Sequence, residues 1–265
     1  MTSGIISFGM PTLIETSTLE ECAKLCAESA LDFIELNMNM PQYQLHKIDV
    51  DYFRSISDKY GISYTIHLDE NLNISDFNTY VAEAYKKTVA DTIEIAKQLD
   101  SKVLNMHMAK GVYFTLPDRK VLLFSEYKEE YFKSIFDFRN MCESIIGEND
   151  IKICIENCDG YEDFQKEAIE LLLESEVFAL TFDVGHNHGI GGTDEEFIMS
   201  HKDRLHHIHL HDAKGRKNHL TLGTGEIDIE KYISLAKEQN CRMVLETKTI
   251  EGIKRSVEWL KGCRK

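Results

Sequence analysis

The feature that most constrains this chain is a regular alternation between short apolar runs and amphipathic helical stretches. The alternation repeats eight times along the sequence. Strict strand–helix alternation predicts an α/β fold with a parallel sheet, and eight units in this length are typical of a closed (β/α)₈ barrel. The alternative is an open, doubly wound sheet, but no Gly-x-Gly-x-x-Gly follows the first run.

The expected elements can be read from these patterns. The predicted strands are Ile5–Met10, Asp32–Asn37, Ser63–Leu68, Lys102–Met108, Lys152–Glu156, Phe178–Asp183, the histidine-rich stretch Leu205–Lys214, and Arg242–Glu246. The predicted helices are Thr18–Cys26, which opens with a capping box, then Val50–Tyr60, Asn78–Leu99, Glu129–Ile146, Phe164–Glu174, Asp194–His201, Ile229–Gln239 and Gly252–Lys261. Between the sixth strand and its helix, four glycines predict a flexible turn: Gly185, Gly189, Gly191 and Gly192.

The composition excludes several classes of function. The 265 residues carry a formal charge of −15, which disfavours binding to nucleic acid or to an anionic membrane. No run approaches the roughly 18 apolar residues of a membrane span, and Met1–Ile6 does not resemble a signal peptide. Seven cysteines without framework spacing fit reduced thiols. We therefore expect a cytoplasmic protein with one domain, residues 1–265, and no membrane partner.

One connection is longer than the others. After the fourth strand, Gly111–Phe124 contains two apolar runs around the turn Pro117–Lys120, which predicts a β-hairpin insertion. It would lie at the carboxyl-terminal mouth of a barrel. A lone apolar hairpin needs a surface to cover, so we interpret residues 112–124 as a lid or as a subunit contact in a homo-oligomer. The alternative is an irregular loop.

The histidine-rich stretch predicts a ligand site. It places four of the chain's eleven histidines within six residues. Because side chains at i and i+2 of a strand share a face, His207, His209 and His211 point the same way. A buried face of imidazoles is unfavourable unless something binds it, and this arrangement at a strand end indicates a metal site.

The other predicted strand ends carry similar residue types. In a barrel these ends converge on one mouth, where active sites form. Imidazole and carboxylate ligands without thiolate favour Mn²⁺, Co²⁺, Mg²⁺ or Zn²⁺. The strand ends carry His67, His107, Glu156, Asp183 with His186, His209 and Glu246, and the loop after the seventh strand adds His219.

These motifs resemble those of the xylose-isomerase-like TIM barrels, a superfamily of sugar and sugar-phosphate isomerases and epimerases that also includes endonuclease IV. The motifs are Ile155–Asn157, Phe182–His186, Ile208–Asp212, Leu222–Asp228 and Val244–Thr247. The resemblance implies a single divalent ion bound by Glu156, Asp183, His209 and Glu246. It also implies isomerisation or epimerisation of a sugar, a sugar phosphate or a related polyol-ketone through a metal-stabilised enediolate. Glu156 and Glu246 would act as acid and base, and His186 would hold a substrate oxygen.

The endonuclease IV branch supplies the alternative function, a zinc-dependent phosphodiesterase. Its three-metal site resembles His67, His107 and Glu156 for one ion, the four ligands above for the second, and His186 with His219 for the third. Lys217 occupies the position of an aspartate ligand in that branch, which disfavours the third ion. The alternative therefore predicts two or three zinc ions. A third class, a binding or regulatory protein, is disfavoured by the complete set of converging ligands.

Basic residues follow three of the strand ends in this otherwise acidic chain. They suggest a small-molecule substrate that is anionic, carrying a phosphate or a carboxylate. The alternative is a set of solvated loop cations. The candidates for substrate binding are Lys110, Lys214, Arg216, Lys217 and Lys248.

Overall fold

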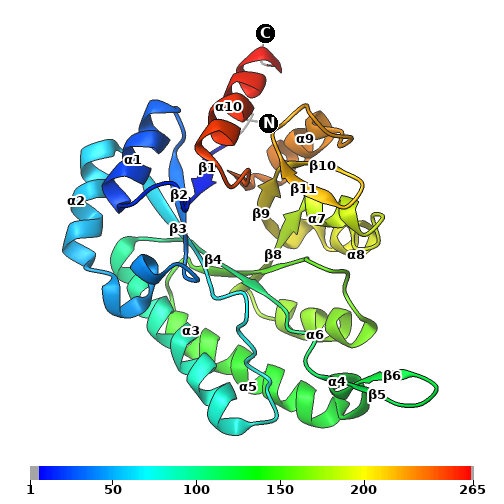
Figure 1. Ribbon diagram of the computed structural model, residues 1–265. Helices are drawn as coiled ribbons and strands as arrows, with labels where there is room; N and C mark the ends of the chain where they lie inside the picture. Colours follow the sequence, from blue (N-terminus) through cyan, green and yellow to red (C-terminus); the bar gives the residue numbers. More distant parts are fainter. Residues whose placement is uncertain (1–5, 264–265) are drawn as a thin grey trace.

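The computed structural model describes residues 6–263 and shows eight parallel strands closed into a barrel (Figure 1). The barrel strands are β1 (Phe8–Pro11), β2 (Phe33–Asn37), β3 (Ser63–His67), β4 (Val103–His107), β7 (Lys152–Glu156), β8 (Phe178–Asp183), β9 (Leu205–Leu210) and β12 (Arg242–Leu245). Their order around the barrel is β1, β12, β9, β8, β7, β4, β3, β2. Apart from the closing β1–β12 pair, neighbours in this ring follow one another along the chain, so the predicted TIM barrel is confirmed. Residues 1–5, which include the start of the first predicted strand, and residues 264–265 lie outside the described part.

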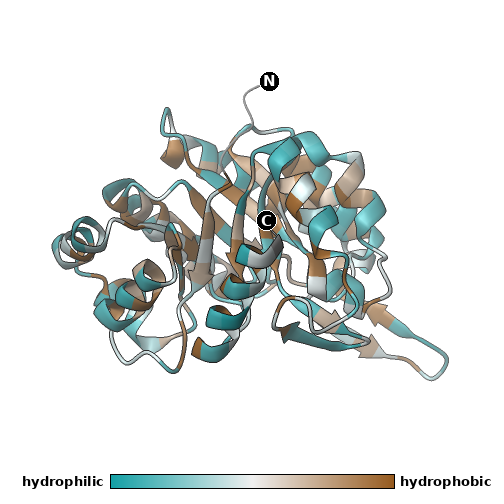
Figure 2. Ribbon diagram, turned by 90° about the horizontal axis from the view of Figure 1, so that it is seen from above, coloured by the Kyte–Doolittle hydropathy of each residue, from teal (hydrophilic) through white to brown (hydrophobic). Residues whose placement is uncertain are grey.

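Helices surround the barrel, with hydrophobic residues on the strands and more hydrophilic residues on the outer helix surfaces (Figure 2). The α-helices are α1 (Leu19–Glu28), α2 (Val50–Tyr60), α3 (Thr79–Leu99), α4 (Leu123–Glu126), α5 (Lys128–Ile146), α6 (Asp163–Leu173), α7 (Val184–Gly189), α8 (Glu195–Ser200), α9 (Ile229–Gln239) and α10 (Ile250–Cys263). Short 3₁₀ turns are η1 (Pro41–Tyr43), η2 (Leu45–Lys47) and η3 (Lys202–Arg204).

Local sequence signals set several of the helix ends. Helix α1 begins after Thr18, whose hydroxyl accepts a hydrogen bond from the Glu21 amide at 3.1 Å. The Glu21 carboxylate in turn accepts from the amide of Ser17 at 2.8 Å, a capping box displaced by one residue. Helices α2 and α5 end at Gly61 and Gly147, both with positive φ, as the sequence predicts.

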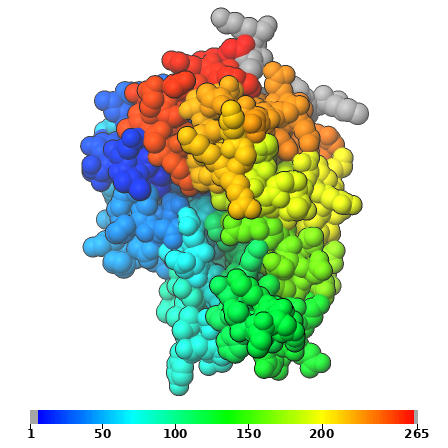
Figure 3. Space-filling view, turned by 45° about the vertical axis from the view of Figure 1, so that its right-hand side comes forward, coloured from blue at the N-terminus to red at the C-terminus, as the bar shows by residue number. Residues whose placement is uncertain are grey.

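Two hairpins lie beyond the barrel strands. Strands β5 (Tyr113–Thr115) and β6 (Lys120–Leu122) pair antiparallel in the connection after β4. The second predicted apolar run is shorter than expected, because Phe124 is already in α4 and stacks on Tyr131. A second antiparallel pair, β10 (Asp212–Lys214) and β11 (Lys217–Leu220), follows β9 and was not predicted. Both hairpins are visible on one face of the molecule, in green and in gold (Figure 3).

The turn predicted after β8 is instead a short helix. Helix α7 begins directly after Asp183, whose carboxylate accepts a hydrogen bond from the His186 amide at 2.7 Å. The prediction of a flexible turn was wrong for Gly185 and Gly189, because this cap starts a helical turn at once. Gly191 and Gly192 follow the helix with positive φ, as a turn requires.

Candidate metal centre at the barrel mouth

Four titratable side chains from four consecutive barrel strands meet at the carboxyl-terminal mouth. Glu156 ends β7, Asp183 ends β8, His209 lies in β9, and Glu246 directly follows β12. All four are buried, and one ligand atom of each lies within 4.8 Å of the others. The sequence predicted that this quartet would converge, and the structure brings it together. Three carboxylates and one imidazole in so small a space form a donor set suited to a divalent cation.

Glu156 contacts four side chains. Its Oε1 lies 2.9 Å from His209 Nδ1, and its Oε2 accepts from the side-chain amide of Asn105. The same Oε2 is 3.1 Å from His107 Nε2 and 3.3 Å from His67 Nε2. Burial alone would raise the pKa of Glu156, but the adjacent imidazoles of His209 and His107 hold it well below its usual range. Glu156 is therefore ionised at neutral pH.

The predicted pair His67 and His107 thus lies on one side of Glu156, and these three groups form a second candidate cluster. Burial opposes a charge on His67, yet the neighbouring Glu156 carboxylate raises its pKa to about 9. The two imidazole rings meet edge to face, with centroids 5.0 Å apart. The cluster shares Glu156 with the quartet, so any ion bound there would be a close neighbour of an ion in the quartet.

Glu246 differs from Glu156 in having a cation beside it. Its Oε1 pairs with the Lys248 ammonium, and its Oε2 lies 3.4 Å from His209 Nδ1 and 3.7 Å from His219 Nε2. Burial would raise the pKa of Glu246, but His209 and Lys248 hold it well below its ordinary value. Lys248 itself has a positive φ of 55°. Because it pairs with Glu246, Lys248 contacts the site through a candidate ligand.

Asp183 is held through its backbone by Asn157 and through its carboxylate by His211. The Asn157 side chain bonds both backbone groups of Asp183, donating to its carbonyl at 2.9 Å and accepting from its amide at 2.8 Å. His211 Nε2 lies 3.1 and 3.2 Å from the two carboxylate oxygens of Asp183. These contacts give Asn157 and His211, which both occur within the motifs, a role in holding Asp183.

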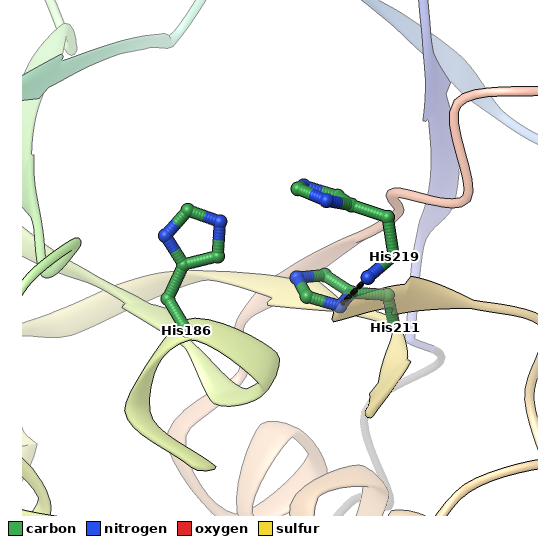
Figure 4. Close-up of side chains that lie close together, drawn as sticks. All are labelled: His186, His211 and His219. Carbon is green, nitrogen blue, oxygen red and sulfur yellow. Dashed lines mark hydrogen bonds between the residues drawn. The ribbon is translucent and has the colours of Figure 1, made fainter. Parts of the chain in front are cut away.

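His186, His211 and His219 form a third cluster (Figure 4). His211 and His219 stack with ring centroids 4.3 Å apart, and His186 stands edge-on to both. The backbone amide of His219 donates to His211 Nδ1 at 2.8 Å, so this nitrogen is an acceptor and the proton lies on Nε2, facing Asp183. Both nitrogens of His211 are thus engaged. His186 Nε2 has no hydrogen-bond partner among the described residues.

A buried layer beneath the quartet was missed by the sequence analysis. Glu35 in β2 contacts both His207 and His209 inside the barrel. The available signal was a lone acidic residue within the apolar run Phe33–Leu36. Alternation alone gave no reason to separate it from a solvent-facing strand residue.

The predicted basic residues lie in two different settings. Lys110 donates to the carbonyl of Asp159 at 3.0 Å and borders a cavity of about 240 Å³ beside Glu156, Cys158 and Tyr161. Lys248 is paired with Glu246. The remaining three, Lys214, Arg216 and Lys217, are exposed on the β10–β11 hairpin. The structure therefore does not gather all five around one position.

No helix among the described residues has the length and apolar character needed to cross a lipid bilayer.

Comparisons with known proteins agree with this architecture. An uncharacterized protein of Methanocaldococcus jannaschii, MJ1614, is 29% identical over 215 residues, which cover 78% of this chain and 79% of that protein. A second uncharacterized protein of that organism, MJ1311, is 27% identical over 269 residues, covering 97% of this chain and 88% of its own.

Among solved structures, a D-tagatose 3-epimerase-like protein has a TM-score of 0.79 and 25% identity, covering 97% of this chain and 96% of its own. The IolI protein with a bound zinc atom has a TM-score of 0.73 and 17% identity, covering 98% and 96%, a likeness that shows the fold alone. The family model for the xylose isomerase-like TIM barrel matches residues 23–263. The chain therefore belongs to the xylose isomerase-like TIM barrel family.

Proposed function

We propose that this protein is a divalent-metal-dependent epimerase or isomerase that acts on a sugar, a sugar phosphate or a related polyol-ketone. The observation that carries the proposal is the buried quartet of Glu156, Asp183, His209 and Glu246, whose ligand atoms lie within 4.8 Å of one another. Family membership and the likeness to a D-tagatose 3-epimerase-like protein support the same class of reaction.

The quartet fits a divalent cation by charge and by donor type. Three carboxylates around one imidazole leave surplus negative charge in a buried place, which is unfavourable without a compensating cation. Oxygen donors with a single nitrogen suit Mn²⁺, Co²⁺, Mg²⁺ or Zn²⁺ better than a soft metal. We propose the quartet as the ligand set and leave the choice among these ions to experiment.

A divalent ion held there would act as a Lewis acid toward a substrate carbonyl and would acidify the adjacent C–H bond. Glu156 and Glu246 would then transfer the proton. Both carboxylates are ionised at neutral pH because cationic or imidazole groups adjoin them, so either can accept a proton. One carboxylate would remove the proton from one face, and the other, once it has taken up a proton from solvent, would return that proton to the opposite face, which inverts the carbon; the first carboxylate then loses its proton to solvent. In the reverse direction their roles exchange.

The test begins with metal content, measured by elemental analysis of protein purified without chelator. About one ion per chain would fit the quartet. The protein is then incubated in D₂O with a panel of ketoses and their phosphates, and deuterium incorporation at C2 or C3 is followed by NMR. Glu156→Gln and Glu246→Gln should abolish incorporation, while the control Glu251→Gln, on the exposed side of α10, should retain it. Metal-loaded protein that exchanges no substrate proton would contradict the proposal.

The hairpin cations support an anionic substrate. Lys214, Arg216 and Lys217 are exposed, and no ion pair to any of them is present in the described part of the chain. A phosphate or carboxylate at the far end of a substrate would find free charge there. Replacing Arg216 and Lys217 together by Ala should raise KM for a phosphorylated ketose and leave KM for its unphosphorylated analogue unchanged. Equal KM values in the variant and the wild type would remove this part of the proposal.

A second candidate function, phosphodiester hydrolysis with zinc, is favoured by the cluster of His67, His107 and Glu156. Zinc in both this cluster and the quartet would give two ions that share Glu156. The third cluster is less suited to an ion because the nitrogens of His211 already bond His219 and Asp183. Two zinc ions per chain together with hydrolysis of a model phosphodiester would favour this function over epimerisation.

A further inference from the structure

A buried carboxylate inside the barrel contacts His209, one of the candidate metal ligands. Glu35 is 1% exposed and lies inside the barrel, on β2. Its Oε1 is 2.8 Å from His209 Nε2, and its Oε2 is 3.0 Å from His207 Nε2. The same Oε2 accepts a hydrogen bond from the Thr65 hydroxyl at 3.1 Å. A carboxylate buried this deeply persists only when donors surround it. Thr65 and His207 hydrogen-bond Glu35, and His209 Nε2 lies in close contact with it without the alignment of a hydrogen bond.

The two nitrogens of His209 therefore face different layers. Nε2 faces Glu35, whereas Nδ1 lies 2.9 Å from Glu156 Oε1 and 3.4 Å from Glu246 Oε2. A neutral imidazole carries one proton, and carboxylates face both nitrogens of His209. A cation bound among the quartet carboxylates would displace the proton from Nδ1 and leave the remaining one on Nε2, which faces Glu35. The other nitrogen then presents its lone pair, and on His209 that nitrogen is Nδ1, among the quartet carboxylates.

We propose that Glu35 is a positioning residue that holds the proton of His209 on Nε2 and thereby presents Nδ1 as a metal ligand. The proposal rests on the function proposed above, because it requires an ion at the quartet. Carboxylate–histidine–metal arrangements of this kind fix the tautomer and the orientation of the ring, and removing the carboxylate weakens metal binding.

His207 and Thr65 complete the arrangement by orienting Glu35. His207 Nδ1 has no hydrogen-bond partner among the described residues, so its Nε2 is the nitrogen that donates to Glu35. The His207 ring meets the His209 ring edge to face at 5.3 Å between centroids. Both Glu35 oxygens are therefore engaged, and rotation of the carboxylate away from His209 would break bonds to two other residues.

The experiment measures zinc affinity by competition with a chromophoric chelator, in the wild type and in three variants. Glu35→Leu removes the acceptor and should weaken zinc binding by about 10- to 100-fold. Glu35→Gln keeps an amide oxygen for His209 Nε2 and should lose less. The control is His206→Ala, the exposed neighbour of His207 on β9, which should bind zinc as the wild type does.

The outcomes separate the two proposals. A wild type that binds no zinc contradicts the proposed function. A wild type that binds zinc, with Glu35→Leu binding it as tightly, overturns the role of Glu35. Loss of a second ion in Glu35→Leu would mean that Glu35, His207 and His209 hold an ion themselves, which also overturns it.

Where Glu35→Leu does not fold, ¹⁵N NMR of the zinc-loaded wild type decides. The proposal requires the His209 proton on Nε2, and a proton on Nδ1 overturns it.

Discussion

His209 links two layers of the site through a single imidazole ring. Burial alone would lower its pKa, but the carboxylates of Glu156, Glu35 and Glu246 hold that pKa well above the ordinary histidine value. The metal-free ring is therefore protonated at neutral pH, with Nδ1 bearing a proton among the quartet carboxylates. A metal ion can bind Nδ1 only after that proton has left.

This protonation makes metal binding depend on pH. We expect each ion bound at the quartet to release about one proton near pH 7, and the affinity to increase as the pH rises toward the raised pKa of His209. Calorimetric titrations in buffers of different ionisation enthalpy measure the proton count. Replacement of His209 by Asn should eliminate this proton release. Metal binding that releases no proton and has the same affinity at pH 6 and pH 8 would show that His209 is not a ligand in this protonation state.

Single residues also show which parts of the site could be predicted from the sequence. Strand ends converge in any barrel, so the four quartet positions followed from the alternation of elements and from residue type. The contacts of Glu35 with His209 and of His211 with Asp183 could not be recognised in this way. Their roles depend on which atoms of other strands lie within 3 Å or so, and register and tilt set those distances only after the barrel has closed.

At the scale of elements, helix α7 is packed against the site so closely that one glycine is required for steric reasons. A Cβ on Gly185 would lie 1.9 Å from His211 Cε1, whereas a Cβ on Gly189 would meet no atom closer than 3.9 Å. Neither glycine has a positive φ, so backbone conformation is not the constraint. The difference lies in the His211 ring, which occupies the space beside Gly185 while it contacts Asp183.

We therefore expect Gly185→Ala to destabilise the protein by about 1–3 kcal/mol through overpacking. It should also weaken metal binding, because His211 must move away from Asp183. Gly189→Ala is the matched control and should leave the free energy of unfolding nearly unchanged. Urea unfolding and metal titration of both variants measure these effects. Equal behaviour of the two variants would mean that the His211 ring is free to shift without consequence.

The β5–β6 hairpin exposes an apolar surface that a single chain does not cover. Val112 and Phe114 are 59% and 57% exposed, and the hairpin projects from the barrel (Figure 1). Deleting the whole insertion would be a poor test of its role, because Phe124 at its end is buried and stacks on Tyr131 at 4.6 Å. Point substitutions of the exposed side chains leave that core contact in place.

We expect Val112→Ser together with Phe114→Ser to shift the protein from a self-associated state to a folded monomer. The apolar side chains are exposed in the single chain, so their loss removes an intermolecular contact and no core packing. Light scattering during size-exclusion chromatography measures the mass. The control is Ile14→Ser, an exposed apolar residue outside the hairpin. A wild type that is already monomeric would favour the interpretation of the hairpin as a lid.

Short elements were the least predictable part of the fold. Helix α7 and strands β10 and β11 span six residues or fewer, and unlike the equally short barrel strands they are rich in polar residues and form no apolar run. They are formed by local contacts instead. The Asp212 carboxylate accepts from the amides of Ala213, Gly225 and Ile227, and this fastens the loop after β11 onto the start of the hairpin.

At the scale of the whole molecule, the barrel could be predicted because its two periodicities extend over the full chain. The barrel strands are buried at nearly every position, and the helices around them bury one apolar stripe. The closing contact pairs β1 with β12, the first and last strands of the barrel, and the pairing of β12 with β9 places Glu246 beside His209. Alternation predicts such closure without any knowledge of the side-chain contacts inside.

Closure also concentrates negative charge at one end of an already acidic molecule. The metal-free protein offsets the quartet carboxylates with His209 and Lys248, and a bound cation would offset them further. Because the quartet forms only in the folded barrel, binding should stabilise the whole chain, by about 2.7 kcal/mol at an ion concentration 100 times Kd. Thermal unfolding with and without the ion measures this gain. Asp183→Asn should lose most of this stabilisation, whereas the variant with Val112→Ser and Phe114→Ser should keep it. A shift of equal size in Asp183→Asn would place the stabilising ion away from the barrel mouth.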